Sequence, residues 1–298
     1  MSFDAPQRLC HLPLVMDVFR RTGMADVIDH AIKQDPRSDV SAAECVAVIL
    51  SGVYVGAHSL WRLRERLEPY DMKTVMQDPT FDLERFPEER LAKMLDDLYR
   101  ADPEKLMTAI SVQMIEAYAL DTSFLHFDTT SLSFYGAYER EDPFSGMTGI
   151  EMPPAVTFGH SKINRSDLKQ LMFGLLVAND GGVPLMGKAL DGNASDSLAA
   201  AEFFGKIRSL VTDPRKVCCV GDSKGWSPRT LSVIQEADMR LLSRLPRTKK
   251  LHARLMADPR EPDGILELPA KRPGKPADTY EYTGFDIDDD MTWYETDD

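Results

Sequence analysis

The chain contains 298 residues, of which 43% are apolar and 28% are charged, a composition typical of a globular protein with about two domains. Its longest apolar run, residues 46–57, is too short to span a membrane. The first residues lack the basic and apolar regions of a signal peptide, so we expect a cytoplasmic protein without a membrane partner.

Charge is distributed unevenly along the sequence. The net charge of −13, taken as a whole, argues against a nucleic-acid partner. Residues 286–298 contain seven acids and no Lys or Arg, whereas residues 240–254 contain six Lys or Arg and no acid. A local basic strip of this kind serves DNA binding even on an acidic protein, or it is an ordinary solvated surface. Cys218 and Cys219 are expected to be reduced core residues on opposite faces of a strand.

Apolar residues recur at helical spacing through residues 1–118, which predicts an all-helical region. Gly23 is a natural helix stop, and Asp102 followed by Pro103 is typical of a helix start. The expected helices cover about residues 12–22, 24–32 and 42–67, with another ending near residue 101 and one opening at residue 102.

From Asp121 onward the pattern changes to short apolar strands separated by polar turns. Asn179-Asp-Gly-Gly182 is a strong hairpin signal, and residues 139–157 are expected to form a mobile loop. The expected strands cover about residues 124–127, 168–177, 184–190, 217–220 and 241–245, and helices cover about residues 197–211 and 227–237. The order β-β-β-α-β-α-β is that of an RNase H-like fold.

Two of these expected strands lead into an aspartate. Asp128 follows residues 124–127, and Asp222 follows residues 217–220 after one glycine. If the strands are neighbours in one sheet, the two carboxylates lie side by side, and paired carboxylates are ligands that Mg²⁺ prefers. Each Asp taken alone is more typical of a turn after a strand. The matched pair, together with the segments described next, favours a metal site.

Four segments stand out in combination: Phe127-Asp128-Thr-Thr-Ser, Gly159-His-Ser-Lys-Ile-Asn-Arg165-Ser-Asp-Leu-Lys-Gln170, Asp191-Gly-Asn-Ala-Ser-Asp196 and Gly221-Asp222-Ser-Lys-Gly. They resemble bacterial insertion-sequence transposases of the DDE class, in the large group typified by insertion sequence four. The helical region before them resembles the N-terminal domain of unknown function that usually precedes such a catalytic core. The resemblance implies an α/β fold with an RNase H-like mixed sheet core after an all-helical N-terminal domain. The expected domains are residues 1–118, residues 119–250 and a partial, strand-rich insertion over residues 251–298.

The resemblance also implies metal-dependent phosphodiester cleavage and strand transfer at transposon ends. Asp128 and Asp222 match the first and second acids of the family, which hold Mg²⁺ or Mn²⁺. The third acid is a Glu with a Tyr, an Arg and a Lys at fixed offsets, and no residue here matches it. Glu236 lies too early, and Glu295 lies on an expected insertion strand, so we expect the chain to be truncated before the Glu-bearing helix.

Two classes of function remain open at this point. The first is a DNA transposase acting on the double-stranded terminal repeats of its element, nucleoid-associated when bound to DNA, or an inactive truncated remnant of one. The second is a non-catalytic DNA- or transposase-binding protein derived from a decayed element. A metal-dependent nuclease on the same fold is a further alternative. Homo-oligomers are compatible with each of these.

Several other side chains have two interpretations each. His126 shares a face with Asp128 and is either a packed histidine or a neighbour of the site. Asn193 and Asp196 flank an expected helix start, and they either cap the helix or support the metal site. The basic side chains that either contact the DNA backbone or are ordinary surface charges are Lys162, Arg165, Lys169, Arg244, Arg247, Lys249 and Lys250.

Overall fold

The computed structural model describes residues 8–33, 37–138, 153–160 and 165–244, together with the strands Gly264–Leu268 and Asp278–Tyr282. The chain divides into two compact units, Met1–Ser243 and Arg244–Asp298. None of the helices in these described ranges is long and apolar enough to cross a membrane.

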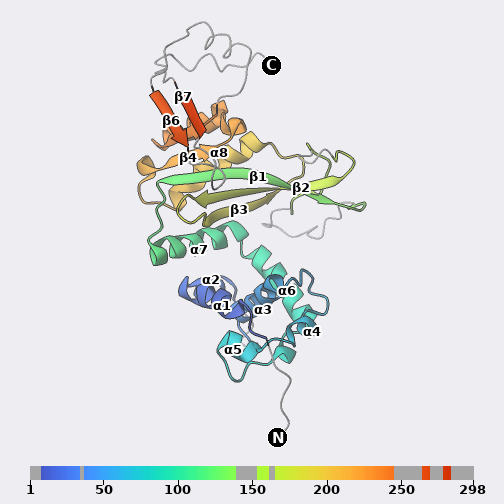
Figure 1. The fold of residues 1–298 in the computed structure, drawn as a ribbon. Helices are drawn as coiled ribbons and strands as arrows, with labels where there is room; N and C mark the ends of the chain where they lie inside the picture. The colour runs from blue at the N-terminus through green and yellow to red at the C-terminus, as the bar shows by residue number, and fades with distance from the viewer. Residues whose placement is uncertain are drawn as a thin grey trace. The chain divides into compact units, whose positions relative to one another are not determined.

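The N-terminal part of the first unit is helical, as the sequence predicts (Figure 1). Its helices are α1 (Leu12–Arg21), α2 (Met24–Ala31), α3 (Ala42–Tyr54), α4 (Leu63–Leu67), α5 (Met72–Met76), α6 (Glu88–Arg100) and α7 (Pro103–Tyr118). Ser41 and Glu44 form a capping box at the start of α3, in which each side chain accepts a hydrogen bond from the other's backbone N–H. Asp102 caps α7 by accepting from the backbone N–H of Lys105 at 3.3 Å, as expected.

The long helix expected over residues 42–67 is wrong. Helix α3 ends at Tyr54, and the chain turns through Gly56, whose φ of +82° favours glycine, before α4 begins at Leu63. The turn folds α4 back against α3, where a Cβ on Gly52 would lie 2.3 Å from Leu63 Cδ1. The apolar period continues through the turn because both helices face the same core, in which Leu63 and Leu67 are buried.

A five-stranded sheet forms the second part of this unit. Its strands are β1 (Phe124–Phe134), β2 (Lys169–Ala178), β3 (Pro184–Leu190), β4 (Cys218–Gly221) and β5 (Arg240–Ser243). The strand order is β3-β2-β1-β4-β5. β1, β2 and β3 pair antiparallel, and β4 and β5 run parallel to β1. This mixed sheet has the strand order of the RNase H-like fold and confirms the expected fold class.

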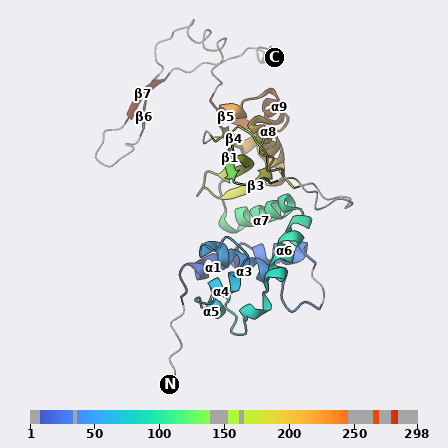
Figure 2. The same ribbon diagram turned by 90° about the vertical axis from the view of Figure 1, so that its right-hand side faces the viewer.

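Helices α8 (Asp196–Lys206) and α9 (Pro228–Glu236) pack against each other and against the sheet (Figure 2). Phe127 of β1 contacts Phe203 and Phe204 of α8, with ring centroids 4.7 Å and 5.8 Å apart. These aromatic pairs lie in the core of the sheet region. The core also contains Cys219, which is a free, buried thiol as expected.

The expected hairpin at residues 179–182 is confirmed between β2 and β3, where Gly181 and Gly182 have φ values of +68° and +64°. The first strand, by contrast, is longer than the expected residues 124–127, because β1 pairs with β2 along its full length from Leu125 to Phe134. Asp128 therefore lies inside β1 and does not follow its end. The Thr and Ser residues after Asp128 suit a strand as well as a turn, and the pairing with β2 decides for the strand.

Helix α7 contributes to both cores of the first unit. Leu106 is buried in the helical core, and Ile115 packs against the core of the sheet. Ser111 is fully buried, and its hydroxyl donates to the carbonyl of Leu185 in β3 at 2.6 Å. α7 lies along β3 and thereby fastens the helices to the sheet (Figure 1).

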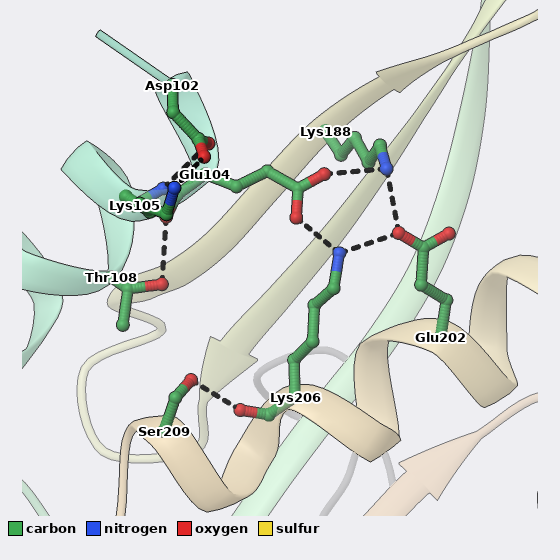
Figure 3. Close-up of polar contacts among 8 residues, drawn as sticks. All are labelled: Asp102, Glu104, Lys105, Thr108, Lys188, Glu202, Lys206 and Ser209. Atoms are coloured by element: carbon green, nitrogen blue, oxygen red, sulfur yellow. Dashed lines mark hydrogen bonds and ion pairs between the residues drawn. The ribbon is translucent and has the colours of Figure 1, made fainter. Parts of the chain in front are cut away.

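Four alternating charges reinforce this contact. Lys188 of β3 pairs with Glu104 of α7 at 2.6 Å and with Glu202 of α8 at 2.7 Å. Lys206 of α8 pairs with the same two carboxylates. Figure 3 shows the closed ring of ion pairs, which we call the α7–α8 charge cluster.

In the second unit, β6 (Gly264–Leu268) and β7 (Asp278–Tyr282) form an antiparallel pair in which Leu266 lies opposite Tyr280. Glu295 lies outside the described residues.

Candidate functional site

Asp128 and Asp222 lie just beyond the segment in which β1 and β4 pair. The two strands run parallel, and their register pairs Phe124 with Cys218 and His126 with Val220. The paired register ends at His126 and Val220, and Asp128 follows His126 by two residues just as Asp222 follows Val220. Because side chains alternate along a strand, the Asp128 side chain lies on the face of His126, away from the buried Phe127, and Asp222 follows the end of β4. The expected neighbourhood of the two strands is confirmed, and the catalytic role of the two acids stays a prediction.

Both aspartates are exposed, and local backbone groups orient their carboxylates. Asp128 Oδ1 accepts from the backbone N–H of Thr129 at 2.7 Å. Asp222 Oδ1 accepts from the backbone N–H of Lys224 at 3.0 Å, in the short 3₁₀ turn that follows β4. The carbonyl of Asp222 accepts from the hydroxyl of Ser243 in β5 at 2.6 Å. The acids are thus accessible to an ion while their carboxylates are partly fixed.

A third carboxylate, that of Asp196, lies between these two segments. Asp196 is the first residue of α8, and its side chain is 15% exposed. Its Oδ1 accepts from the hydroxyl of Thr129 at 2.6 Å, and its Oδ2 pairs with the ammonium group of Lys224. Asp196 therefore contacts the residue that follows Asp128 and the residue two places after Asp222.

The ammonium group of Lys224 interacts electrostatically with all three aspartates. Its hydrogen bond to Asp196 raises the pKa of Lys224 above its ordinary value, against a smaller opposing effect of burial, and the charges of Asp196, Asp222 and Asp128 raise it further. Lys224 therefore stays protonated and places one positive charge among the carboxylates. Neither Lys224 nor Thr129 received a role from the sequence, although both lie within two residues of a predicted acid.

The segments that carry the family resemblance also contact one another. The buried side chain of Gln170 donates through Nε2 to the carbonyl of Gly192 at 2.7 Å. The backbone N–H of Ala155 donates to Asp191 Oδ1 at 2.6 Å, and the N–H of Gly192 donates to the carbonyl of Ala155 at 3.0 Å. Thr157 pairs with Gln170 through both backbone groups.

These contacts fix the turn before α8, and so the position of Asp196. The approach is so close that a Cβ on Gly192 would lie 2.0 Å from the carbonyl oxygen of Gln170 and 2.6 Å from that of Thr157. A Cβ on Gly159 would lie 1.9 Å from the carbonyl oxygen of Gly192. Both glycines are required because two backbone segments meet there.

The donors present fit one divalent ion. Mg²⁺ is commonly bound through one or two carboxylates while it keeps several waters, and Asp128 and Asp222 are exposed carboxylates of this kind. Within the part of the chain that the structure describes, no group of three or more His, Cys, Asp or Glu side chains is placed to hold a metal. Lys224 supplies a further positive charge beside the two acids.

The remaining candidates are dispersed. His126 Nε2 lies 3.2 Å from Asn179 Oδ1 in the hairpin turn. Arg165 donates to both carboxylate oxygens of Asp167 at 2.7 Å and 2.8 Å, and Lys169 donates to the carbonyl of Tyr138 at 3.2 Å. The predicted roles of Arg165 and Lys169 in DNA binding stay predictions, and so does a role of His126 near the site.

Three further candidates, Asn193, Arg244 and Glu236, add little to the geometry of the site. Asn193 and Arg244 are exposed, and Glu236 lies at the C-terminal end of α9, where its carboxylate accepts from Ser232 at 2.9 Å. The candidates that lie outside the described residues are Lys162, Arg247, Lys249 and Lys250.

Comparison with known proteins gives limited matches. A family model described as "Domain of unknown function (DUF4277)" matches residues 5–112, which is the helical part and less than half of the chain. A search of curated proteins finds no match. Two solved structures with detectable similarity contain transposases, and their printed descriptions are "Mos1 transposase paired-end complex with left transposon end" and "Cryo-EM structure of piggyBac transposase synaptic complex with hairpin DNA (SNHP)".

The Mos1 chain is 13% identical over 73% of this chain and 62% of its own length, with a TM-score of 0.27. The piggyBac chain is 11% identical over 98% of this chain and 66% of its own length, with a TM-score of 0.38. This chain thus spans less than two thirds of either protein. At these TM-scores the structures superpose poorly, and the proposal below therefore depends on the topology and residues of this chain.

Proposed function

We propose that this chain is a DNA-processing protein of the transposase type, in which Asp128 and Asp222 hold a divalent metal ion for phosphodiester cleavage at the ends of an insertion element. The observation that supports the proposal is the parallel pairing of β1 and β4 in an RNase H-like sheet, because Asp128 and Asp222 follow the last paired residues, His126 and Val220, by two positions each. The sequence segments that resemble DDE transposases support it, because they meet around this position.

In this function, backbone N–H groups would orient the two carboxylates, and Lys224 would offset part of their negative charge. The backbone N–H groups of Thr129 and Lys224 orient one oxygen of each acid, and both aspartates are exposed. A bound Mg²⁺ or Mn²⁺ supplies Lewis-acid polarisation of a phosphate oxygen and lowers the pKa of an attacking water. The positive charge of Lys224 offsets part of the negative charge that would otherwise repel a phosphodiester.

The test is a cleavage assay with the 298-residue chain, Mn²⁺ and a labelled duplex that carries the inverted repeats flanking its gene. A random duplex of equal length is the substrate control. A nick at the repeat end that Asp128→Asn and Asp222→Asn abolish would support the proposal. Because no residue of this chain matches the third acid of the family, we expect the 298-residue chain not to carry out transposition by itself. Asp213→Asn is the matched control, because Asp213 pairs with Arg215 before β4 begins and has no contact with the site.

Three results would count against this proposal in different ways. Equal cleavage of both duplexes would indicate a metal-dependent nuclease on the same fold. Nicking that survives Asp128→Asn would place the chemistry elsewhere. The absence of nicking, with binding retained, would favour the second candidate function.

That second candidate is a non-catalytic DNA- or transposase-binding protein. The position of Lys224 favours it, because its ammonium group offsets one of the three negative charges without a metal. In this case a mobility-shift assay should show binding to the repeat duplex that is unchanged by Asp128→Asn and falls steeply with salt.

A further inference from the structure

Asp196 is at the centre of a symmetric set of contacts. On one side, Thr129 donates its backbone N–H to Asp128 and its hydroxyl to Asp196, at 2.7 Å and 2.6 Å. On the other side, Lys224 donates its backbone N–H to Asp222 at 3.0 Å, and its ammonium group pairs with Asp196. One carboxylate of α8 thereby connects the residues that orient both acids.

The environment of Asp196 makes this link stiff. Thr129 is buried at 5% exposure, and the Asp196 side chain is only 15% exposed, so water competes weakly for their hydrogen bond. The clamp of Gln170 on Gly192 fixes the turn that leads into α8. A charged acceptor in such a place orients its donors more strongly than a neutral one.

Helix capping alone does not account for these contacts. The N-cap residue of α8 is Ser195, which makes no side-chain capping bond, and Asp196 is the first residue inside the helix. Its two oxygens point to β1 and to the turn after β4, which are far apart in the sequence. The helix dipole stabilises a carboxylate in the first turn whichever way its side chain points. The dipole therefore does not explain why Asp196 contacts Thr129 and Lys224.

We propose that Asp196 is a positioning residue that holds Asp128 and Asp222 at the separation a divalent ion requires, through Thr129 and Lys224. This inference rests on the proposed function, because it assumes that the two acids bind the metal. Residues that orient metal ligands from outside the coordination sphere typically change metal affinity by about 10–100-fold when they are replaced.

The experiment measures Mn²⁺ affinity of the full 298-residue chain by calorimetry and by electron paramagnetic resonance of free Mn²⁺. We expect Asp196→Asn and Thr129→Val to weaken Mn²⁺ binding by about 10-fold or more, and Thr129→Ser, which keeps the hydroxyl, to restore it. Thr129→Val changes no charge, so its effect reports orientation and not the loss of a negative charge near the ion.

Asp191→Asn is the matched charge control. Asp191 lies in the same turn and accepts from the backbone of Ala155, which an Asn oxygen also does. We expect this variant to bind Mn²⁺ as the wild type does. If Asp196→Asn fails to fold, the Thr129→Val and Thr129→Ser pair decides the matter alone.

The outcomes separate the two proposals. Saturable Mn²⁺ binding that Asp128→Asn and Asp222→Asn abolish, but that Asp196→Asn and Thr129→Val leave unchanged, would overturn the positioning role and keep the metal site. Wild-type binding that is insensitive to Asp128→Asn and Asp222→Asn, or no binding at all, would overturn both. Equal weakening by Asp196→Asn and Asp191→Asn, with none by Thr129→Val, would reduce the effect to general charge and refute the positioning role.

Discussion

The α7–α8 charge cluster should stabilise the first unit measurably, and Lys188→Met is the substitution that tests it. Methionine keeps most of the volume of the lysine stem and removes the ammonium group that contacts Glu104 and Glu202 at 2.6 Å and 2.7 Å. The two carboxylates then share only Lys206 (Figure 3). Because α7 contributes to the helical core and α8 to the sheet core, losing these ion pairs weakens the contact between α7 and α8.

The magnitude follows from the exposure of the partners. Exposed ion pairs contribute roughly 0.2–1 kcal/mol, and removing one partner of a buried pair costs about 3–5 kcal/mol. The side chains of Lys188, Glu104 and Glu202 are 27%, 33% and 37% exposed, which lies between these limits. Screening by solvent reduces the larger value, and we expect a loss of about 2 kcal/mol in the free energy of unfolding. At ~2–4 °C per kcal/mol for a unit of this size, the melting temperature falls by about 4–8 °C.

The assay is thermal and urea unfolding followed by circular dichroism, with Lys105→Met as the matched control. Lys105 also lies in the first turn of α7, but its side chain is 84% exposed and pairs only with the N-cap Asp102 among the contacts described. Its replacement should leave the free energy of unfolding nearly unchanged, because solvent screens an exposed ion pair. If Lys188→Met and Lys105→Met destabilise the chain equally, the cluster contributes no more than surface charge. A double-mutant cycle of Lys188→Met with Glu104→Gln that yields no coupling would refute the reasoning as well.

Three further predictions concern pH, packing and domain limits. Burial opposes ionisation of Glu104 and Glu202, but hydrogen bonds from Lys188 and Lys206 outweigh it and hold both pKa values below the usual range. The stabilisation by these ion pairs is therefore present above about pH 4.5 and is lost as the pH falls further. Acid unfolding of Lys188→Met should show a weaker pH dependence in that window. Gly192→Ala should destabilise the chain by about 1–3 kcal/mol, because its Cβ would meet two carbonyl oxygens. Gly225→Ala is the control: its Cβ would meet no atom within 4 Å, and it should change stability by less than about 0.5 kcal/mol. Equal unfolding free energies of the two variants would contradict this. Limited proteolysis is predicted to cut first within residues 139–157 or after about residue 255, and first cleavage inside residues 168–190 would contradict the expected domain limits.

The order of the elements could be predicted because each one carries its own local signal. The Asn179-Asp-Gly-Gly182 turn specifies its hairpin through residues that accept positive φ, and Asp102-Pro103 specifies the start of α7. The end of α3 could not be read in the same way, because the apolar pattern continues through Gly56 into a helix that packs on the same core. The end of β1 was missed for a related reason. Its length depends on the pairing partner β2, which lies about forty residues away in the sequence.

Part of the candidate site could likewise be predicted from the sequence, and part could not. Asp128 and Asp222 could be proposed from two strands with one acid each, since the RNase H-like order makes those strands neighbours. The contact of Asp196 with Thr129 and Lys224 joins three segments that only the folded chain brings together. The sequence left Asp196 between a helix cap and a support for the metal site, and the structure gives Ser195 the N-cap position.

Charge connects these features to the acidic character of the chain. Asp128, Asp196 and Asp222 contribute three negative charges and Lys224 one positive charge, so the site carries a formal charge of about −2 before any ion binds, in a protein of net charge −13. A DNA phosphate approaching this site would be repelled, because physiological salt screens charges only partly at separations below the Debye length of ~8 Å. In the proposed function, a divalent cation held by Asp128 and Asp222 would bring the local charge to zero and remove the repulsion. We therefore expect metal binding to precede the approach of the scissile phosphate, with Lys224 limiting the repulsion among the carboxylates until the ion arrives.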